Sequence, residues 1–293
     1  MRKQFVKTTE DLMALDERVV VLLGDISVFG FRNAFQQYPK RIYNIGICEQ
    51  AMTSLSAGLA REGLIPIIHS IAPFLVERAM EQLKIDLCYQ RLKVNVVSVG
   101  GSYDYAALGS THHCPADVAL LRTLPGMDIV IPGTPEEFDR LFRVAYANKR
   151  PTYFRLSERR NPLGYEVKFG CAEVIRRGNL ATIIAVGSTL AAVMEAVSGL
   201  DVTVLYYTTV APFDGDTLAE NCQSDKIVLV EPYYSGVLNA DILSALRHSK
   251  VLIKNIGVPH RFLTNYGRAE QHDEVIGLTP QNIRMLVKEV IHA

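Results

Sequence analysis

The chain has 293 residues, with 31 basic and 31 acidic side chains and 48% hydrophobic residues. The balanced charge provides no long-range field that would attract nucleic acid or an anionic membrane, so we expect proteins and small molecules as partners. The apolar runs are short and are interrupted by Gly, Pro or charge, and none reaches the roughly 20 residues of a membrane span.

The start of the chain and the cysteines both indicate a cytoplasmic protein. Residues 1–5 lead directly into a helix-like stretch with several acidic residues, without the apolar core of a secretory signal. The five cysteines are an odd number and widely spaced, and none forms the C-x-x-C pair that is typical of zinc sites and redox couples. We therefore expect reduced, mostly buried thiols.

Short β-branched runs alternate with helical stretches along the first half of the chain. The strands predicted from these runs are, in order, residues 19–25, 41–45, 66–70, 94–100 and 129–132. Helices are predicted over 49–61, over 74–90 and over 135–146. This alternation is typical of a parallel sheet covered by helices on both faces, which predicts an α/β fold.

The segment 156–170 is rich in charge, Pro and Gly and has no clear period, which indicates a domain boundary near residue 165. A second α/β unit follows, with strands predicted over 181–186, 202–205 and 226–230 and a helix over 189–197. We therefore predict two domains, residues 1–164 and residues 165–293, each built on a parallel sheet.

The most informative segment is Asn44-Ile45-Gly46-Ile47-Cys48-Glu49-Gln50. It reads as a strand end, a glycine turn and a glutamate at the start of a helix of small residues. The pattern places one carboxylate where the edge of a sheet meets a helix. A glutamate at a helix start is also favoured by the helix dipole alone, so the segment by itself leaves a structural and a functional role open.

This segment resembles the N-x-G-I-x-E-Q segment of transketolases, of deoxyxylulose-phosphate synthases and of the β subunits of 2-oxo acid dehydrogenases. Further matches occur in the same order along the chain: Leu22-Leu23-Gly24-Asp25, Phe74 ahead of a long helix, and Thr111-His112-His113 followed by Leu124-Pro125-Gly126-Met127. The resemblance covers essentially the whole chain. It corresponds to the second half of a single-chain transketolase, namely the thiamine diphosphate pyrimidine-binding domain and the C-terminal domain.

The first half of such a transketolase carries the G-D-G-x(n)-N segment that holds magnesium and the cofactor diphosphate, and that segment is absent from this sequence. The resemblance therefore implies thiamine diphosphate as the cofactor and no metal ligands in this chain. It implies an N-terminal, diphosphate-binding transketolase subunit as a partner that supplies the Mg²⁺ ligands. It also implies a dimer of this chain within a heterotetramer.

Four residues are assigned to the cofactor by resemblance. Glu49 matches the glutamate that hydrogen-bonds the aminopyrimidine ring and favours its imino form, which removes the thiazolium proton. Ile71 and Phe74 match the wall of the aminopyrimidine pocket, with Phe74 as the stacking surface, and Asp25 ends the matching Leu-Leu-Gly-Asp segment. An ordinary core position is the alternative for Phe74.

Five residues are assigned to the substrate by resemblance. His112 matches a histidine that points at the substrate carbonyl, where it would donate hydrogen bonds to developing oxyanion charge, and His113 is a secondary candidate. Tyr103 stands where relatives commonly have a histidine that reaches phosphate. Arg2 and Arg159 match phosphate contacts, since a guanidinium binds phosphate through two donors. The Arg159 segment equally fits a solvated run of charges.

The resemblance implies a ketol transferase that moves a two-carbon unit from a ketose, a sugar or sugar phosphate, to an aldose. The β subunit of a 2-oxo acid dehydrogenase, or a deoxyxylulose-phosphate synthase-like enzyme, is an open alternative because it uses the same glutamate and pocket. A non-catalytic structural subunit is the second alternative. Around Ser110 the chain lacks the acid that contacts a donor sugar hydroxyl in single-chain transketolases, so the donor is left undefined.

Overall fold

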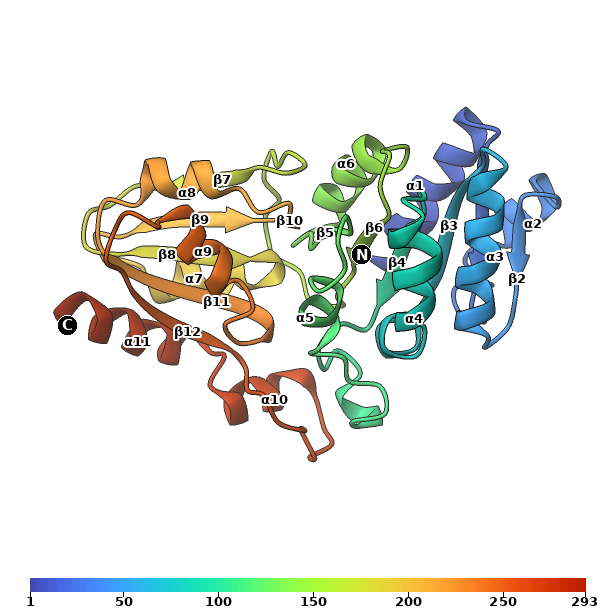
Figure 1. Ribbon diagram of the computed structural model, residues 1–293. Coiled ribbons are helices and arrows are strands. Elements are labelled where there is room, and N and C mark those ends of the chain that lie inside the picture. Colours follow the sequence, from blue (N-terminus) through green and yellow to red (C-terminus); the bar gives the residue numbers. More distant parts are fainter.

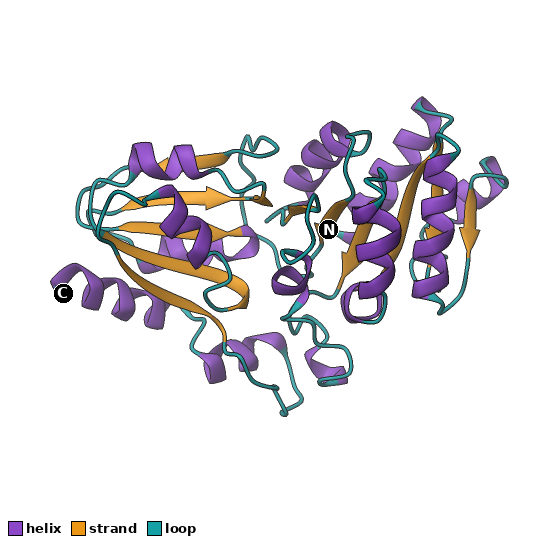
Figure 2. Ribbon diagram, in the orientation of Figure 1, coloured by secondary structure: helices purple, strands orange, loops and turns teal.

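The computed structural model describes residues Met1–Ala293 and contains two sheets, each with helices packed against it (Figure 1). The larger sheet has seven strands in the order β10-β5-β6-β4-β3-β1-β2, and the smaller sheet has five in the order β12-β11-β8-β9-β7. Figure 2 shows the two sheets side by side, with helices around each of them. The prediction of an α/β fold with two sheet-based units is confirmed.

Most strands of the larger sheet form from apolar runs of the first half that are buried on both faces, whereas the edge strand β2 has two exposed residues. Its strands are β1 (Val19–Leu23), β2 (Ile42–Asn44), β3 (Ile65–Ile71), β4 (Asn95–Val99), β5 (Asp128–Val130), β6 (Thr152–Arg155) and β10 (Thr209–Ala211). All neighbouring strands run parallel except β10, which pairs antiparallel with β5. Because β10 belongs to the second half of the chain, the sheet of the first half is completed by the second.

Helices cover both faces of this sheet. They are α1 (Arg2–Leu15), α2 (Arg32–Gln37), α3 (Glu49–Arg61), η1 (Pro73–Glu77), α4 (Met80–Gln82), η2 (Leu83–Tyr89), η3 (Ala106–Leu108), α5 (Asp117–Leu121) and α6 (Pro135–Ala145). The buried side chains of α1 and α6 belong to one apolar core, and those of α3 and η2 belong to another. The long helix predicted over 74–90 is irregular, because η1 and η2 are π-helical and only the short α4 between them is α-helical.

The smaller sheet comprises β7 (Ala172–Arg176), β8 (Thr182–Val186), β9 (Thr203–Tyr207), β11 (Lys226–Tyr234) and β12 (Leu252–Val258). Its helices are η4 (Gly187–Thr189), α7 (Leu190–Ala196), α8 (Gly215–Asn221), α9 (Asn239–Ala245), α10 (Ala269–Ile276) and α11 (Pro280–His292). Neighbouring strands run parallel except β7, which is antiparallel to β9. The chain passes between the sheets in the stretch from β6 to β7, and the division at residue 165 stays a prediction.

The helices are short relative to a lipid bilayer. No helix combines the length and the apolar character that crossing a membrane requires.

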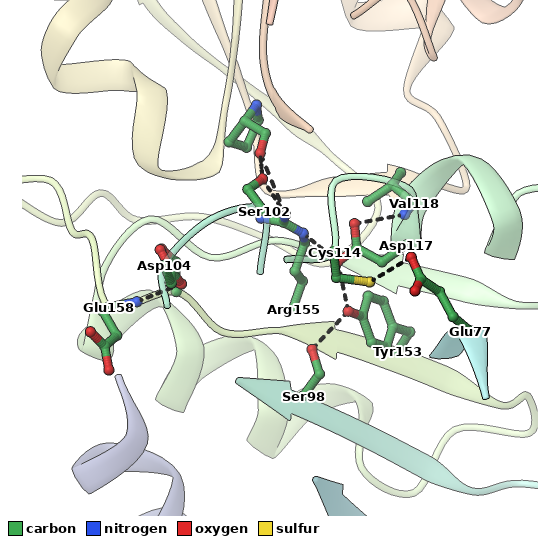
Figure 3. Close-up of polar contacts among 12 residues, drawn as sticks. Glu77, Ser98, Ser102, Asp104, Cys114, Asp117, Val118, Tyr153, Arg155 and Glu158 are labelled. Carbon is green, nitrogen blue, oxygen red and sulfur yellow. Dashed lines mark hydrogen bonds and ion pairs between the residues drawn. The ribbon is translucent and has the colours of Figure 1, made fainter. Parts of the chain in front are cut away.

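A buried ion pair of the first half lies where the two halves of the chain meet. Arg155 at the end of β6 and Asp117 at the start of α5 have side chains that are 2% and 0% exposed, and Arg155 Nε donates to Asp117 Oδ2 at 2.7 Å. Arg155 Nη2 also donates to Ser102 Oγ at 2.7 Å and to the carbonyl oxygen of Pro232 in β11 at 3.4 Å (Figure 3). Tyr153 donates its hydroxyl to Asp117 at 2.9 Å. The network holds β6 of one sheet against β11 of the other.

His69 of β3 is a fully buried histidine whose ring nitrogens are both bonded. Nδ1 lies 2.8 Å from the carbonyl oxygen of Val97, so it carries the proton, and Nε2 accepts from Ser27 Oγ at 2.9 Å. Burial is the main cause that lowers the pKa of His69 to about 3. His69 is therefore a neutral core residue.

We expect His69→Gln to change how folding stability depends on pH. Because the folded-state pKa lies below the unfolded value of about 6.5, the unfolded state binds an extra proton between pH 6.5 and pH 3, and wild-type stability falls as pH falls through that window. The stability advantage of the wild type over His69→Gln should shrink by about 2 kcal/mol between pH 7 and pH 5. Urea denaturation at both pH values measures it, and a constant difference would contradict the depressed pKa.

Candidate functional site

The candidate site lies where α3 begins, next to the carboxyl ends of β1, β2 and β3. Glu49 is the first residue of α3 and is 1% exposed. Its Oε1 accepts a hydrogen bond from Ser70 Oγ at 2.7 Å, and its Oε2 accepts one from Arg78 Nη1 at 2.7 Å. Both oxygens of this buried carboxylate are therefore bonded, and its charge is balanced by a guanidinium that is 39% exposed.

Gly24 allows Glu49 and Ser70 to lie this close to the end of β1. A Cβ atom at Gly24 would lie 2.9 Å from Ser70 Oγ and 3.4 Å from Glu49 Oε1. The next residue, Asp25, has a φ of 59° and exchanges two hydrogen bonds of 3.0 Å with the side-chain amide of Asn44. These bonds fix the ends of β1 and β2 beside Glu49. Asp25 itself is exposed, and its assignment to the cofactor stays a prediction.

Phe74 of η1 lies next to two charged or polar side chains. The Cζ atom of Arg78 lies 4.3 Å from the centre of the Phe74 ring, and the His112 ring contacts Phe74 edge-on, with centroids 5.3 Å apart. Ile71, at the end of β3, is partly buried against the core. The structure therefore brings the predicted residues Phe74 and His112 together and connects them to Glu49 through Arg78.

Three of the predicted substrate residues lie in a different cluster, where loops of the first half meet α10. Arg159 makes two hydrogen bonds, of 2.8 and 2.6 Å, to the carboxylate of Asp273, and the Tyr103 hydroxyl donates to the same carboxylate. The rings of His113 and His272 lie 5.3 Å apart, and burial lowers the pKa of both. A phosphate would have to replace Asp273 as the partner of Arg159. The substrate roles of Tyr103, His113 and Arg159 stay predictions.

Arg2 lies in the first turn of α1. Its Nε donates to Ser27 Oγ at 2.8 Å, and this hydroxyl in turn bonds His69. A contact between Arg2 and a phosphate stays a prediction as well.

Sequence reasoning missed Ser70 and Arg78, the two residues that bond Glu49. The register of β1 and β3 pairs Leu23 with His69, which places Ser70 next to Gly24. Arg78 follows Phe74 by four residues, a spacing that puts two side chains on the same face of a helix. The spacing is visible in the sequence, but the side of the helix that faces Glu49 is not.

Comparisons with known proteins cover both halves of the chain. Residues 1–162 match the family described as transketolase, pyrimidine binding domain, and residues 170–283 match the family described as transketolase, C-terminal domain. A curated relative, described as an uncharacterized 33.6 kDa protein in the fasciation locus of Rhodococcoides fascians, is 34% identical over 95% of this chain and 91% of its own length. A subunit of the apulose-4-phosphate transketolase of Phocaeicola vulgatus is 30% identical over 91% of this chain and 92% of its own length.

A solved structure also matches over nearly the full length. It is a split-gene transketolase described as an inactive β4 tetramer, with a TM-score of 0.86, 25% sequence identity, and coverage of 99% of this chain and 97% of that one. Sequence and fold thus agree over both domains. The chain belongs to the transketolase family and corresponds to the β subunit of members that are divided between two chains.

Proposed function

We propose that the chain is the aminopyrimidine-binding subunit of a transketolase-like transferase that moves a two-carbon ketol unit from a ketose to an aldose. The observation that carries the proposal is the carboxylate of Glu49, which is 1% exposed at the start of α3 and lies near Phe74. The family uses thiamine diphosphate, which supplies, when bound, a thiazolium carbon that attacks the carbonyl of the substrate.

The side chains around Glu49 fit an aminopyrimidine ring. Glu49 Oε2 accepts from a planar nitrogen donor, Arg78 Nη1, and a protonated ring nitrogen is a donor of the same kind. Phe74 offers a flat apolar face, and stacking of two aromatic rings contributes roughly 0.5 to 1.5 kcal/mol beyond burial. Glu49 would hold a proton at the ring nitrogen, and an aspartate would end one methylene short of it.

His112 is the residue that we assign to the substrate. Its edge-on contact with Phe74 ties its position to the wall of the proposed cofactor pocket. Nδ1 lies 2.9 Å from Thr111 Oγ1. In the tautomer in which this hydroxyl donates to Nδ1, the ring proton is on Nε2, which can donate to an oxyanion that develops on the substrate carbonyl.

The proposal includes a second kind of subunit. No group of three or more His, Cys, Asp and Glu side chains in this chain is arranged to hold a metal ion, and the sequence lacks the G-D-G segment. We therefore place the ligands of Mg²⁺ and of the diphosphate on a separate subunit, in a heterotetramer with two copies of each chain. The split-gene neighbour supports this, since its tetramer of β chains alone is described as inactive. All five cysteines are free thiols, which supports the cytoplasmic location that we propose, but only Cys88 and Cys114 are buried, so the prediction of mostly buried thiols is wrong.

We expect the isolated chain to bind thiamine diphosphate poorly in the presence of Mg²⁺, because the contacts to the diphosphate are missing. Addition of the diphosphate-binding subunit should lower the dissociation constant of the cofactor by at least about a hundredfold, which corresponds to roughly 2.7 kcal/mol of binding free energy. Titration calorimetry measures both affinities. Light scattering of the same samples should report a dimer of this chain alone and a heterotetramer with the partner.

Activity assays on this chain mixed with the diphosphate-binding subunit distinguish the possible functions. Turnover of a ketose and an aldose by the mixture, absent from either chain alone, supports the transferase. Decarboxylation of a 2-oxo acid would favour the dehydrogenase or synthase alternatives instead. A complex that forms but neither binds the cofactor nor turns over any of these substrates would indicate a non-catalytic subunit. Tight binding by the isolated chain would contradict the divided site.

A further inference from the structure

Arg78 contacts both Glu49 and Phe74, the two residues that we assign to the aminopyrimidine ring. Its Nη1 donates to Glu49 Oε2 at 2.7 Å, and its planar guanidinium lies over Phe74 with Cζ 4.3 Å from the ring centre. An aminopyrimidine is likewise planar, donates an N–H to a carboxylate and stacks on an aromatic face. Guanidinium groups resemble it in these properties because they are flat, rich in donors and suited to stacking.

Arg78 follows directly after the π-helical turn η1 (Pro73–Glu77). The backbone N–H of Arg78 donates to the carbonyl oxygen of Pro73 at 3.1 Å, a hydrogen bond that spans five residues instead of four. Phe74 and Arg78, four residues apart, lie on the same side of this turn, and Arg78 reaches Glu49. Short π-helical segments inside helices occur frequently at functional sites, which agrees with a role for this one.

The two partners of the ion pair differ in their freedom to move. Glu49 is 1% exposed, and its Oε1 accepts a hydrogen bond from Ser70. The carboxylate also packs closely against β1, since a Cβ atom at Gly24 would lie 3.4 Å from Oε1. The Arg78 side chain is 39% exposed and has a long, unbranched stem. The guanidinium can therefore leave toward solvent while the carboxylate stays in place.

We propose that Arg78 occupies the aminopyrimidine position in the chain without cofactor and is displaced when the cofactor binds. This inference rests on the proposed function of Glu49 and Phe74. In the absence of cofactor, Arg78 balances the buried charge of Glu49, which would be unfavourable without a partner. On binding, the ring replaces the guanidinium at Glu49 Oε2 and over Phe74. Part of the favourable interaction with the ring is offset by the loss of the Arg78 contacts, so Arg78 weakens cofactor binding.

The test is the dissociation constant of thiamine diphosphate, measured by calorimetry on the reconstituted complex. Arg78→Met keeps a long side chain without charge or donors, and we expect it to bind the cofactor roughly tenfold more tightly than the wild type. Arg78→Lys keeps the charge but not the planar group, and should give a smaller gain. Arg61→Met makes the same change on the exposed end of α3 and should leave the dissociation constant unchanged.

Equal or weaker binding by Arg78→Met would overturn the inference, because Arg78 would then remain beside Glu49 in the complex or play no part. If Arg78→Met does not assemble with the partner, Arg78→Gln, which keeps a donor without charge, gives the same comparison. A gain that persists in the Glu49→Ala background would also overturn it, since the effect would not come from the ion pair. Glu49→Ala alone tests the proposed function: unchanged cofactor binding by that variant would refute the role of Glu49, whatever Arg78 does.

Discussion

Glu49→Gln is expected to lower the turnover rate of the reconstituted enzyme by at least about a hundredfold, the usual scale for the loss of a group that acts in proton transfer. Glutamine has the length of glutamate and keeps an oxygen that accepts from Ser70. It cannot hold a proton at the aminopyrimidine nitrogen as a carboxylate does. Since both residues have similar volume, the fold should survive.

Deuterium exchange of the thiazolium proton measures the step that we assign to Glu49, independently of any later step with substrate. Glu62→Gln is a matched control, because it makes the same chemical change at an exposed position just after α3 and should leave both the exchange and the turnover rate unchanged. If Glu49→Gln exchanged the proton at nearly the wild-type rate, activation would not depend on this carboxylate.

Arg155→Met is expected to lower the free energy of unfolding by about 3 to 5 kcal/mol, because it leaves Asp117 as an uncompensated buried charge. The two side chains are 2% and 0% exposed, so water cannot replace the lost partner. Methionine fills much of the same volume, which keeps loss of packing small. Urea denaturation at fixed protein concentration measures the change.

Two further variants show whether the loss comes from charge. Arg140→Met removes an exposed partner of Glu166, and this solvent-exposed pair should contribute no measurable stability. Asp117→Asn combined with Arg155→Met removes both charges and should be more stable than Arg155→Met alone, so the two effects are not additive. Equal losses for Arg155→Met and for the double variant would show that packing, and not the buried charge, accounts for the effect.

Most strands could be predicted because a buried strand has a local signature. The runs Val19–Leu23 and Thr182–Val186 are short, apolar and rich in β-branched residues, and both form interior strands of their sheets. β6 was missed because it ends in Arg155, whose burial makes sense only beside Asp117, 38 residues earlier in the chain. The long helix predicted over 74–90 is present as consecutive helical segments, but its π-helical turns were not foreseen, since a hydrophobic period does not encode a π-helical hydrogen-bond pattern.

Within the candidate site, only residues that belong to a sequence motif could be predicted. Glu49, Phe74 and His112 each fall inside a segment with a family pattern, and the structure brings these three segments to one region. Ser70 and Arg78 contact Glu49 across 21 and 29 residues of sequence, and no period reveals such a contact. The same holds for Arg159, whose partner Asp273 lies 114 residues away.

The three residues of β10 limit how this chain can be divided. Thr209 and Ala211 pair with Val130 and Ile129 of β5, so the outer side of the first sheet is covered by a strand from beyond residue 165. A fragment that ends at residue 164 would leave the backbone donors and acceptors of β5 open, and an open strand edge readily recruits other chains. A cut between the two domains near residue 165 would therefore divide one hydrogen-bonded sheet. A chimera that combines the first domain of this chain with the second domain of a relative must keep a matching pair of β5 and β10.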